Sequence, residues 1–523
     1  MKTRLPDQLI VVVLAACGFL IQSLAWPLSA GRDFESYILY YLEMGQTNPL
    51  YPLLMVFRTP IVPIFHGSVL QYGGANLDEL IMGILFCISI LLIYKIGLRW
   101  NRRIAWGSAL ALILYPSYGL MYHQVSSEGL FAFGLILWLN YIFNSVESPN
   151  NLKFVVHGIF VFILILIRPV AQVFLAFAVF PLTFYKLSPW KKFRFSLAFL
   201  FSSVFLILTY SAYNFIRYND FTVSRSSGAH IPLYRLFVAD YEFLPLDANN
   251  GPRSTKLIDA IESDLLKKEP YLSYGIDLET FVASGNSRMW GDLVSLSDRI
   301  WGWNSDYKYL RLAAIETIQA NPINYIFRVI RSFIGAFWKT VIWNSPQRIS
   351  IDEKDEIEFD TNGLPAPTEG QLIPISNTWW LASSPDQHYQ VDWQHYYATG
   401  EIQLVGPVWQ DHFLTLEGEK EQLVSKLPPR NGLRYVSDAL NWISQFFPRI
   451  LLFVLVGIAG LFYDPRKDIT LWFMVGLSFL YLVISYSGVY TITEFRVPFD
   501  PLYILGGVIG GTSIYIRFIE ARR

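Results

Sequence analysis

Long apolar segments constrain the fold of this chain more than any other feature. They cover residues 9–27, 80–98, 104–122, 128–143, 154–168, 169–186, 195–216, 448–463, 469–488 and 499–516. A helix needs about 20 residues to cross roughly 30 Å of hydrocarbon, and most of these segments approach that length. The sequence therefore predicts a mainly α, polytopic membrane protein with about ten spans.

The composition supports this prediction and excludes several other classes. Hydrophobic residues make up 53% of the 523 positions and charged residues only 16%, against about 25% charged in soluble domains. The net charge of −1 gives no indication of nucleic-acid binding. Cys17 and Cys87 both lie in apolar segments and cannot form a disulfide framework or a metal cluster. We expect no metal and no cofactor. The first apolar segment is too long for a signal-peptide core and is interpreted as a retained span.

The basic residues in short loops predict the orientation of the spans. Lys and Arg concentrate in cytoplasmic loops of membrane proteins. An even number of spans places five basic groups on one side: Lys2 and Arg4; Arg99, Arg102 and Arg103; Lys191, Lys192 and Arg194; Arg466 and Lys467; Arg517, Arg522 and Arg523. We therefore expect a multi-pass protein of the plasma or inner membrane, with both termini cytoplasmic and its active site on the extracytoplasmic face.

Residues 321–343 are apolar enough to resemble a further span. However, Asn324, Arg328, Arg331, Ser332 and Lys339 fall on one face at 100° per residue. A basic stripe opposite an apolar face is typical of a helix that lies in the membrane interface. Counting this segment as a span would also place the basic C-terminus outside. We favour the interfacial helix.

These assignments divide the chain into three parts. Residues 1–216 form an N-terminal seven-span module whose first outer loop is 28–79, and residues 448–523 form a C-terminal three-span module. The extracytoplasmic region 217–447 lies between them and contains the interfacial helix 321–343. It has helical patterning near 254–268 and 306–319. Residues 344–440 are richer in Pro, Gly, Asp and Gln and predict a small domain or lid with short strands such as 401–405. The outer region is therefore expected to mix α-helix with short β-strands.

Two carboxylates stand where the first span leaves the bilayer. Asp33 and Glu35 follow the first apolar segment directly. A carboxylate is the usual base for deprotonating an acceptor that attacks an anomeric carbon. Spacing i, i+2 points the two in different directions on a helix, so one faces the site and the other a structural partner. The alternative is a solvated helix N-terminus, where carboxylates are favourable beside the helix dipole.

A second acid and a cation are expected near membrane depth. Glu128 begins the fourth span on the outer side, and Arg168 occupies the outer turn between the fifth and sixth spans. Charges at this depth are costly unless they are paired or face a cavity. A Glu128–Arg168 pair meets that requirement. The alternative is that each side chain reaches separately to the interface.

Cations on the outer face are candidates for binding a phosphate leaving group, on which charge builds as the bond breaks. They are Arg217, Arg225, Arg235, Arg328, Arg331 and Arg496. His66, His123 and His230 lack the spacing of metal ligands and are interpreted as polar interface residues. The sequence contains no Walker loop, Gly-rich dinucleotide turn or Gly-x-Ser-x-Gly elbow.

Five local patterns, in this order, resemble the GT-C superfamily of glycosyltransferases, which use polyprenyl-phosphate sugars. The resemblance is to protein O-mannosyltransferases, lipid A aminoarabinose transferases and bacterial lipopolysaccharide-core transferases. The patterns are residues 31–37 (GRDFESY) with 48–52 (NPLYP), 115–128 (YPSYGLMYHQVSSE), 167–169 (IRP), 321–325 (NPINY) and 495–501 (FRVPFDP).

The resemblance implies a GT-C-like bundle that transfers a hexosyl or pentosyl group from a polyprenyl-phosphate monosaccharide to a glycan, lipid or protein acceptor. Asp33 then becomes the leading catalytic base, with Glu35 as the second candidate. Glu128, Tyr37, Arg168, Arg328, Arg331 and Arg496 become candidates for binding the donor and its phosphate. Two alternatives remain open at this stage. One is a flippase or transporter of a lipid-linked glycan. The other is a polymerase or ligase that uses a lipid-linked oligosaccharide.

Overall fold

The computed structural model describes most of the chain. The described residues are 5–31, 33–46, 52–218, 220–225, 246–267, 271–275, 277–283, 293, 296–297, 300–301, 307–339, 383–384, 387–388, 390–391, 404–405, 408–428, 432–461, 469–488 and 493–520. Arg32, His230, Arg235 and most of the predicted small domain lie outside them.

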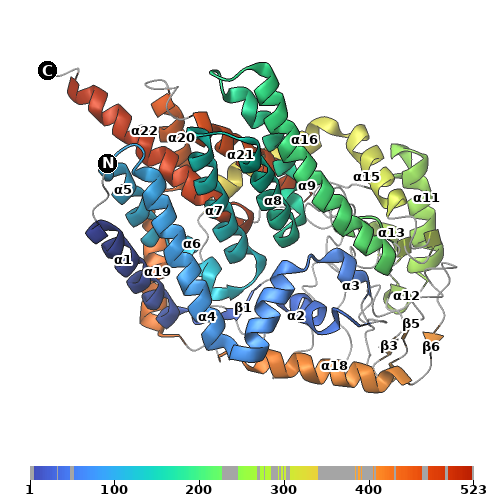
Figure 1. Ribbon diagram of the computed structural model, residues 1–523. Coiled ribbons are helices and arrows are strands. Elements are labelled where there is room, and N and C mark those ends of the chain that lie inside the picture. The colour runs from blue at the N-terminus through green and yellow to red at the C-terminus, as the bar shows by residue number, and fades with distance from the viewer. Residues whose placement is uncertain are drawn as a thin grey trace.

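Long apolar helices form the body of the protein. Within the described residues, seven helical segments are long and apolar enough to cross a membrane. They are Pro6–Ala25 in α1 (Leu5–Ala25), α4 (Ile61–Gly97), α7 (Ser127–Glu147), α9 (Pro189–Tyr218), Arg434–Leu461 (α19, Arg434–Phe446, with α20, Ile450–Leu461), α21 (Ile469–Gly488) and Val497–Ile519 (η8, Val497–Phe499, with most of α22, Asp500–Glu520). Figure 1 shows both ends of the chain on one side of the molecule, in keeping with an even number of spans.

Three further apolar segments complete the set expected from the sequence. An eighth span results if α5 (Arg102–Ile113) is joined to the helix Pro116–His123, which is bent from it by 64° and consists of α6 (Pro116–Leu120) and η1 (Met121–His123). The two others, α8 (Asn151–Ile167) and η2 (Pro169–Thr183), are shorter. The multi-pass character is therefore confirmed by helix length and composition, whereas the total of ten spans stays a prediction.

The helix η2 is longer than an α-helix of the same 15 residues would be. It is a 3₁₀ helix, which rises about 2.0 Å per residue, so that 15 residues extend about 30 Å. Three residues per turn also align every third side chain. Ala171, Phe174, Phe177 and Phe180 follow this spacing, and each is fully buried. The aromatic stripe thus packs against the bundle along one edge of the helix.

The helix α4 is folded into two parts. Gly74 has φ 69° and ψ −176° in its middle, which is not a helical conformation. Glycine adopts positive φ at little cost because it has no Cβ. The part after Gly74 corresponds to the predicted span 80–98, and the part before it lies within the first outer loop. Figure 1 shows the two parts of α4 at a sharp angle.

Shorter elements gather at the end of the bundle opposite the chain termini (Figure 1). The helical ones are α2 (Phe34–Glu43), α3 (Pro52–Phe57), η4 (Ala248–Asn250), α11 (Pro252–Ala260), the π-helix η5 (Ile261–Leu265), α12 (Tyr271–Tyr274), α13 (Leu278–Ala283), α15 (Lys308–Ala320), α16 (Pro322–Trp338), α18 (Val408–Ser425) and η7 (Thr493–Phe495). In the part of the chain that the structure describes, the strands form three two-residue pairs: β1 (Ser29–Ala30) with β2 (Gln124–Val125), β3 (Ser383–Ser384) with β4 (Gln387–His388), and β5 (Gln390–Val391) with β6 (Leu404–Val405). One apolar cluster joins the bundle helices, and a second joins α2, α3, α11 and α15.

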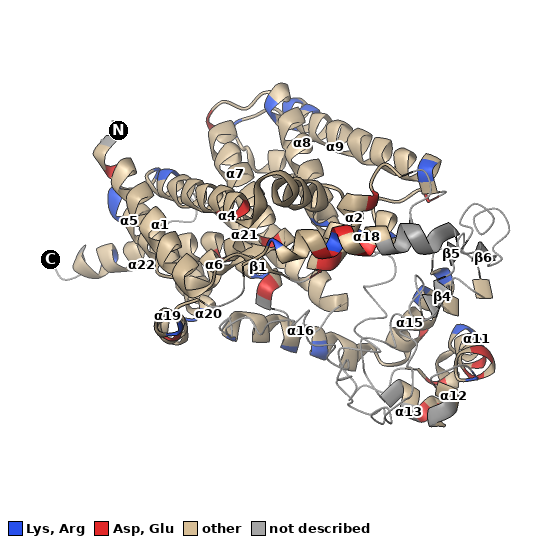
Figure 2. Ribbon diagram, turned by 90° about the horizontal axis from the view of Figure 1, so that it is seen from below, with Lys and Arg blue, Asp and Glu red and all other residues tan. Residues whose placement is uncertain are grey.

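The helix α16 has the amphipathic character expected for 321–343. Its 17 residues place it outside the set of candidate spans. Val329, Ala336 and Phe337 are buried, whereas Ile323, Phe327 and Trp338 are among its exposed apolar side chains. In Figure 2 the helix carries basic segments and no acidic one, which agrees with its sequence. The helix is therefore amphipathic, although Ser332 of the predicted polar face is buried. Its location in the membrane interface stays a prediction.

Candidate active site

A short parallel pairing brings two of the predicted motifs together. β1 pairs with β2, with Ser29 opposite Gln124 and Ala30 opposite Val125. Ser29 Oγ also donates a hydrogen bond to the carbonyl oxygen of His123 at 3.3 Å. The start of the first outer loop is thereby fixed beside the residues that begin α7. Asp33 and Glu128, nearly a hundred positions apart in the sequence, follow these two strands.

Gly31 is required where the two segments touch. A Cβ at this position would lie 2.7 Å from Ser126 Cβ and 2.8 Å from the carbonyl oxygen of Val125. A larger residue at position 31 would therefore push the two segments apart.

We expect Gly31→Ala to lower the free energy of unfolding by about 1–3 kcal/mol, the usual cost of overpacking. Thermal unfolding of the purified protein measures this. The matched control is Gly418→Ala in α18, where a Cβ meets no atom within 4 Å. Equal unfolding temperatures for the two variants would contradict the role of Gly31.

Asp33 precedes α2 in a strained conformation. Its φ is 62° and its ψ is 13°, in the left-handed region, which costs about 1–2 kcal/mol for most residues and less for Asp. Such strain is concentrated at functional sites. The carboxylate does not cap α2. Instead it forms a bidentate ion pair with Arg58, with Nη2–Oδ1 at 2.9 Å and Nη1–Oδ2 at 3.1 Å.

Arg58 connects Asp33 to the buried part of the site. It follows α3, and its guanidinium lies 5.4 Å from the ring centroid of Tyr37. Burial lowers the pKa of Arg58, but Asp33, Tyr37 and Glu128 together raise it by more. Burial raises the pKa of Tyr37, whose hydroxyl has a hydrogen bond with Ser127. Arg58 therefore stays charged, and Tyr37 stays a neutral phenol.

The predicted pair of Glu128 and Arg168 is present. Arg168 Nη2 donates to Glu128 Oε1 at 3.1 Å, and both side chains are buried. The guanidinium is 4.9 Å from the ring centroid of Phe495 and 5.7 Å from that of Phe131. Among the described residues, Arg168 Nη1 and the nearby hydroxyl of Tyr481 are buried without a hydrogen-bond partner. The pair thus leaves one buried donor of Arg168 free to bind an anion.

The cluster of Asp33, Tyr37, Arg58, Glu128 and Arg168 is joined by the contacts given above, whereas the other predicted residues are exposed or have other partners. Glu35 is exposed on α2. On α16, Arg331 is exposed, and Arg328 donates to Asn324 Oδ1 at 3.1 Å. Among the other outer cations, Arg217 donates to the Gln46 carbonyl oxygen at 2.7 Å. Arg225 is buried in an ion pair with Asp220.

Arg496 is held entirely by protein groups. Its Nε and Nη2 donate to the two carboxylate oxygens of Asp500 at 2.9 and 3.1 Å, and Nη2 also donates to the Tyr115 hydroxyl at 3.0 Å. Its Nη1 donates to the carbonyl oxygens of Ala336 and Lys339. A guanidinium has five N–H donors, so that none remains for a substrate phosphate. We therefore leave Arg496 out of the proposed phosphate site.

The two histidines of the described chain that we expected at the interface are fully buried, so that expectation was wrong. His66 forms a 2.7 Å contact with Asp78, and His123 lies 3.4 Å from Glu79. Both acids lie in α4. The mostly apolar sequence of this helix gave no indication that their side chains point into the protein. Within the described residues, no group of three or more His, Cys, Asp or Glu side chains could hold a metal ion.

Comparison with known proteins gives little further information. No family model matches the chain, and no curated protein matches it. Among solved structures, it is similar to the crystal structure of ArnT from Cupriavidus metallidurans bound to undecaprenyl phosphate. The match has 13% identity, covers 97% of this chain and 79% of that one, and has a TM-score of 0.33. A TM-score this low does not establish a shared fold.

Arg58 is the site residue that sequence analysis missed. It is the one Lys or Arg between Phe34 and Glu79. The available signal was a cation in a loop segment whose other charged residues are all acids. Tyr481 carried no such signal, because a tyrosine within a span is ordinary in an aromatic-rich bundle.

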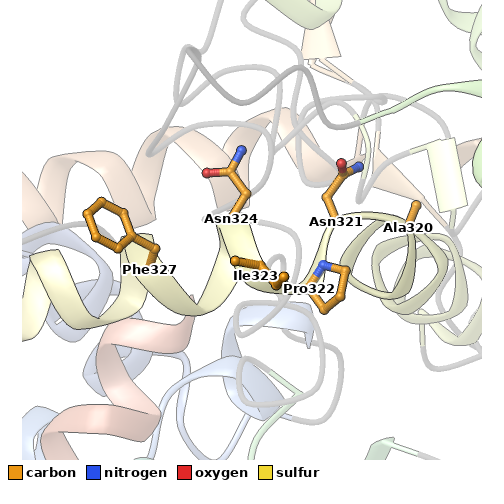
Figure 3. A pocket seen from close by; sticks show the side chains of 6 residues that line it. All are labelled: Ala320, Asn321, Pro322, Ile323, Asn324 and Phe327. Atoms are coloured by element: carbon orange, nitrogen blue, oxygen red, sulfur yellow. The ribbon is translucent and has the colours of Figure 1, made fainter.

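An open hollow lies at the junction of α15 and α16, and no member of the ion pairs described above lines it. Figure 3 shows its lining, which is Ala320, Asn321, Pro322, Ile323, Asn324 and Phe327. Asn321 and Asn324 point to the same side of α16 in this view. The lining includes the first four residues of the 321–325 motif but no titratable side chain, so the hollow offers no acid or base for catalysis.

Proposed function

We propose that this protein is a membrane glycosyltransferase that moves a monosaccharide from a polyprenyl-phosphate carrier to an acceptor hydroxyl on the extracytoplasmic side. The observation that supports this best is the cluster of Asp33, Tyr37, Arg58, Glu128 and Arg168 beside the bundle of apolar helices. It combines a carboxylate suited to act as a base with cations suited to bind a phosphate.

The proposed reaction needs few groups. Asp33 accepts the proton of the acceptor hydroxyl, and the acceptor oxygen forms a bond to the anomeric carbon. The bond between that carbon and the phosphate oxygen breaks, and polyprenyl phosphate leaves with the additional negative charge. Arg58 and the free Nη1 of Arg168 stabilise this charge, because guanidinium groups bind phosphate oxygens well. The Glu128 carboxylate holds Arg168 in place for that contact.

A reconstitution experiment tests the proposal. Purified protein in lipid vesicles is given a polyprenyl-phosphate monosaccharide with a mixture of lipid, glycan and peptide acceptors. We expect release of free polyprenyl phosphate that depends on both the protein and the acceptor mixture. Protein-free vesicles and the Asp33→Asn variant are the controls. Movement of the intact lipid-linked sugar across the vesicle, with no carrier released by any acceptor, would replace the transferase with a flippase. Activity only with lipid-linked oligosaccharides would indicate a polymerase or ligase.

A further inference from the structure

Two neighbouring acids of α4 each face a histidine behind the proposed active site. Asp78 Oδ2 lies 2.7 Å from His66 Nδ1, and Glu79 Oε1 lies 3.4 Å from His123 Nδ1. The Asp78 and His66 side chains are fully buried. The reaction proposed above uses none of these four groups. Charged residues at membrane depth are costly and rare without a function.

The contact between Asp78 and His66 depends on the fold of α4. Twelve residues separate them, which corresponds to about 18 Å along a straight helix. They meet because the chain turns at Gly74, where φ is 69°. A side chain at that position would oppose this conformation. The fold at Gly74 therefore brings the outer part of α4 back against its inner part.

The other ring nitrogen of His66 contacts the turn that begins the active site. His66 Nε2 lies 3.3 Å from the carbonyl oxygen of Ser126. A carbonyl oxygen only accepts hydrogen bonds, so Nε2 must carry a proton. Nδ1 faces a carboxylate, so one further proton lies between Nδ1 and Asp78 Oδ2. The pair then has no net charge, which avoids the large cost of burying a single charge.

We propose that His66, oriented by Asp78, is a positioning residue for the active site. It holds the Ser126 carbonyl and thereby fixes the two residues that follow, Ser127 beside Tyr37 and Glu128 beside Arg168. The functional part of this inference rests on the proposed transferase activity. The Glu79–His123 pair lies at the other end of the same turn, where the His123 carbonyl receives the hydrogen bond from Ser29. The two pairs thus lie at the two ends of the turn formed by residues 124–126, on its buried side.

Two substitutions with the same number of side-chain heavy atoms as Asp78 test the positioning role. In Asp78→Asn the side-chain amide donates to Nδ1, so a neutral His66 still donates from Nε2 to Ser126. In Asp78→Leu the ring loses its orienting partner. We expect Asp78→Asn to keep kcat within about threefold of the native value and Asp78→Leu to lower it about 10–100-fold, because small misplacements of catalytic groups have large effects. The donor KM should change much less than kcat. The control is His157→Gln in α8, a buried histidine that accepts from Trp138 Nε1, and we expect it to leave kcat unchanged.

Equal kcat values for Asp78→Asn and Asp78→Leu, whether both normal or both low, would overturn the positioning role.

Two measurements do not depend on transferase activity. Hydrogen exchange of the peptide that contains residues 124–128 should be about 5–10-fold faster in Asp78→Leu than in Asp78→Asn, as expected for the loss of one hydrogen bond. Nitrogen NMR of the histidine-labelled native protein, with His66 assigned by its loss in His66→Gln, should show a protonated Nε2. An unprotonated Nε2 would overturn the inference even if Asp78→Leu fails to fold. Absence of sugar transfer with both of these results as expected would refute the proposed function and leave the structural role of His66 intact.

Discussion

We expect Asp33→Asn to lower the rate of sugar transfer by about 10²–10⁴-fold, the range for loss of a general base. Asparagine has nearly the same size as aspartate and tolerates the left-handed backbone conformation. The substitution therefore removes the base while leaving the φ of 62° accessible. The rate of polyprenyl phosphate release from a lipid-phosphate monosaccharide, at saturating donor and acceptor, measures the effect.

Two further variants show whether a loss of activity in Asp33→Asn is specific to the Asp33 carboxylate. Glu35→Gln removes the second acid of the motif, which is exposed on α2, and it should keep near-native activity. Arg58→Lys keeps the charge but cannot form the bidentate contact with Asp33. It should therefore give an intermediate loss. Native turnover by Asp33→Asn, with loss in Glu35→Gln, would exchange the roles of the two acids.

The sequence predicted those features of the structure that a membrane requires of a single segment or a single pair of charges. Apolar runs predicted the approximate positions of the candidate spans, because length and hydropathy decide which segments can enter a bilayer. The candidate span Arg434–Leu461 is an exception, since it begins before the predicted start at residue 448. The Glu128–Arg168 pair was also predictable, since unpaired charges near membrane depth are too costly to persist. The amphipathic pattern of α16 followed from its 100° periodicity.

The remaining features depend on tertiary contacts or on backbone conformations that no periodicity reveals. The contact between Arg58 and Asp33 depends on the directions of α3 and α2. The fold at Gly74 converts an apparently continuous helix into two parts and turns His66 inward. The 3₁₀ geometry of η2 is hidden because its apolar residues also suit an α-helix. At Arg496 a signal was present and overlooked, since Asp500 follows it at i, i+4. Arg496, which was predicted to bind a phosphate, instead forms a buried ion pair with Asp500.

That ion pair leads to the largest expected effect on stability. Arg496 and Asp500 are fully buried and share the hydroxyl of Tyr115. Removing one member leaves an uncompensated buried charge, which costs about 3–5 kcal/mol. We therefore expect Arg496→Ala to lower the thermal unfolding temperature and the yield of folded protein strongly. Arg194→Ala, at an exposed arginine of α9, is the control and should have little effect.

A double variant decides whether charge or shape is responsible for this loss. Arg496→Met together with Asp500→Leu removes both charges and keeps apolar volume, and such replacements of buried pairs are often neutral or stabilising. We expect it to recover most of the stability lost in Arg496→Ala. The Nη1 contacts with the Ala336 and Lys339 carbonyl oxygens at the end of α16 would still be lost, so recovery should be incomplete. An Arg496→Ala protein with native unfolding behaviour but weakened use of the lipid donor would instead return Arg496 to the phosphate site.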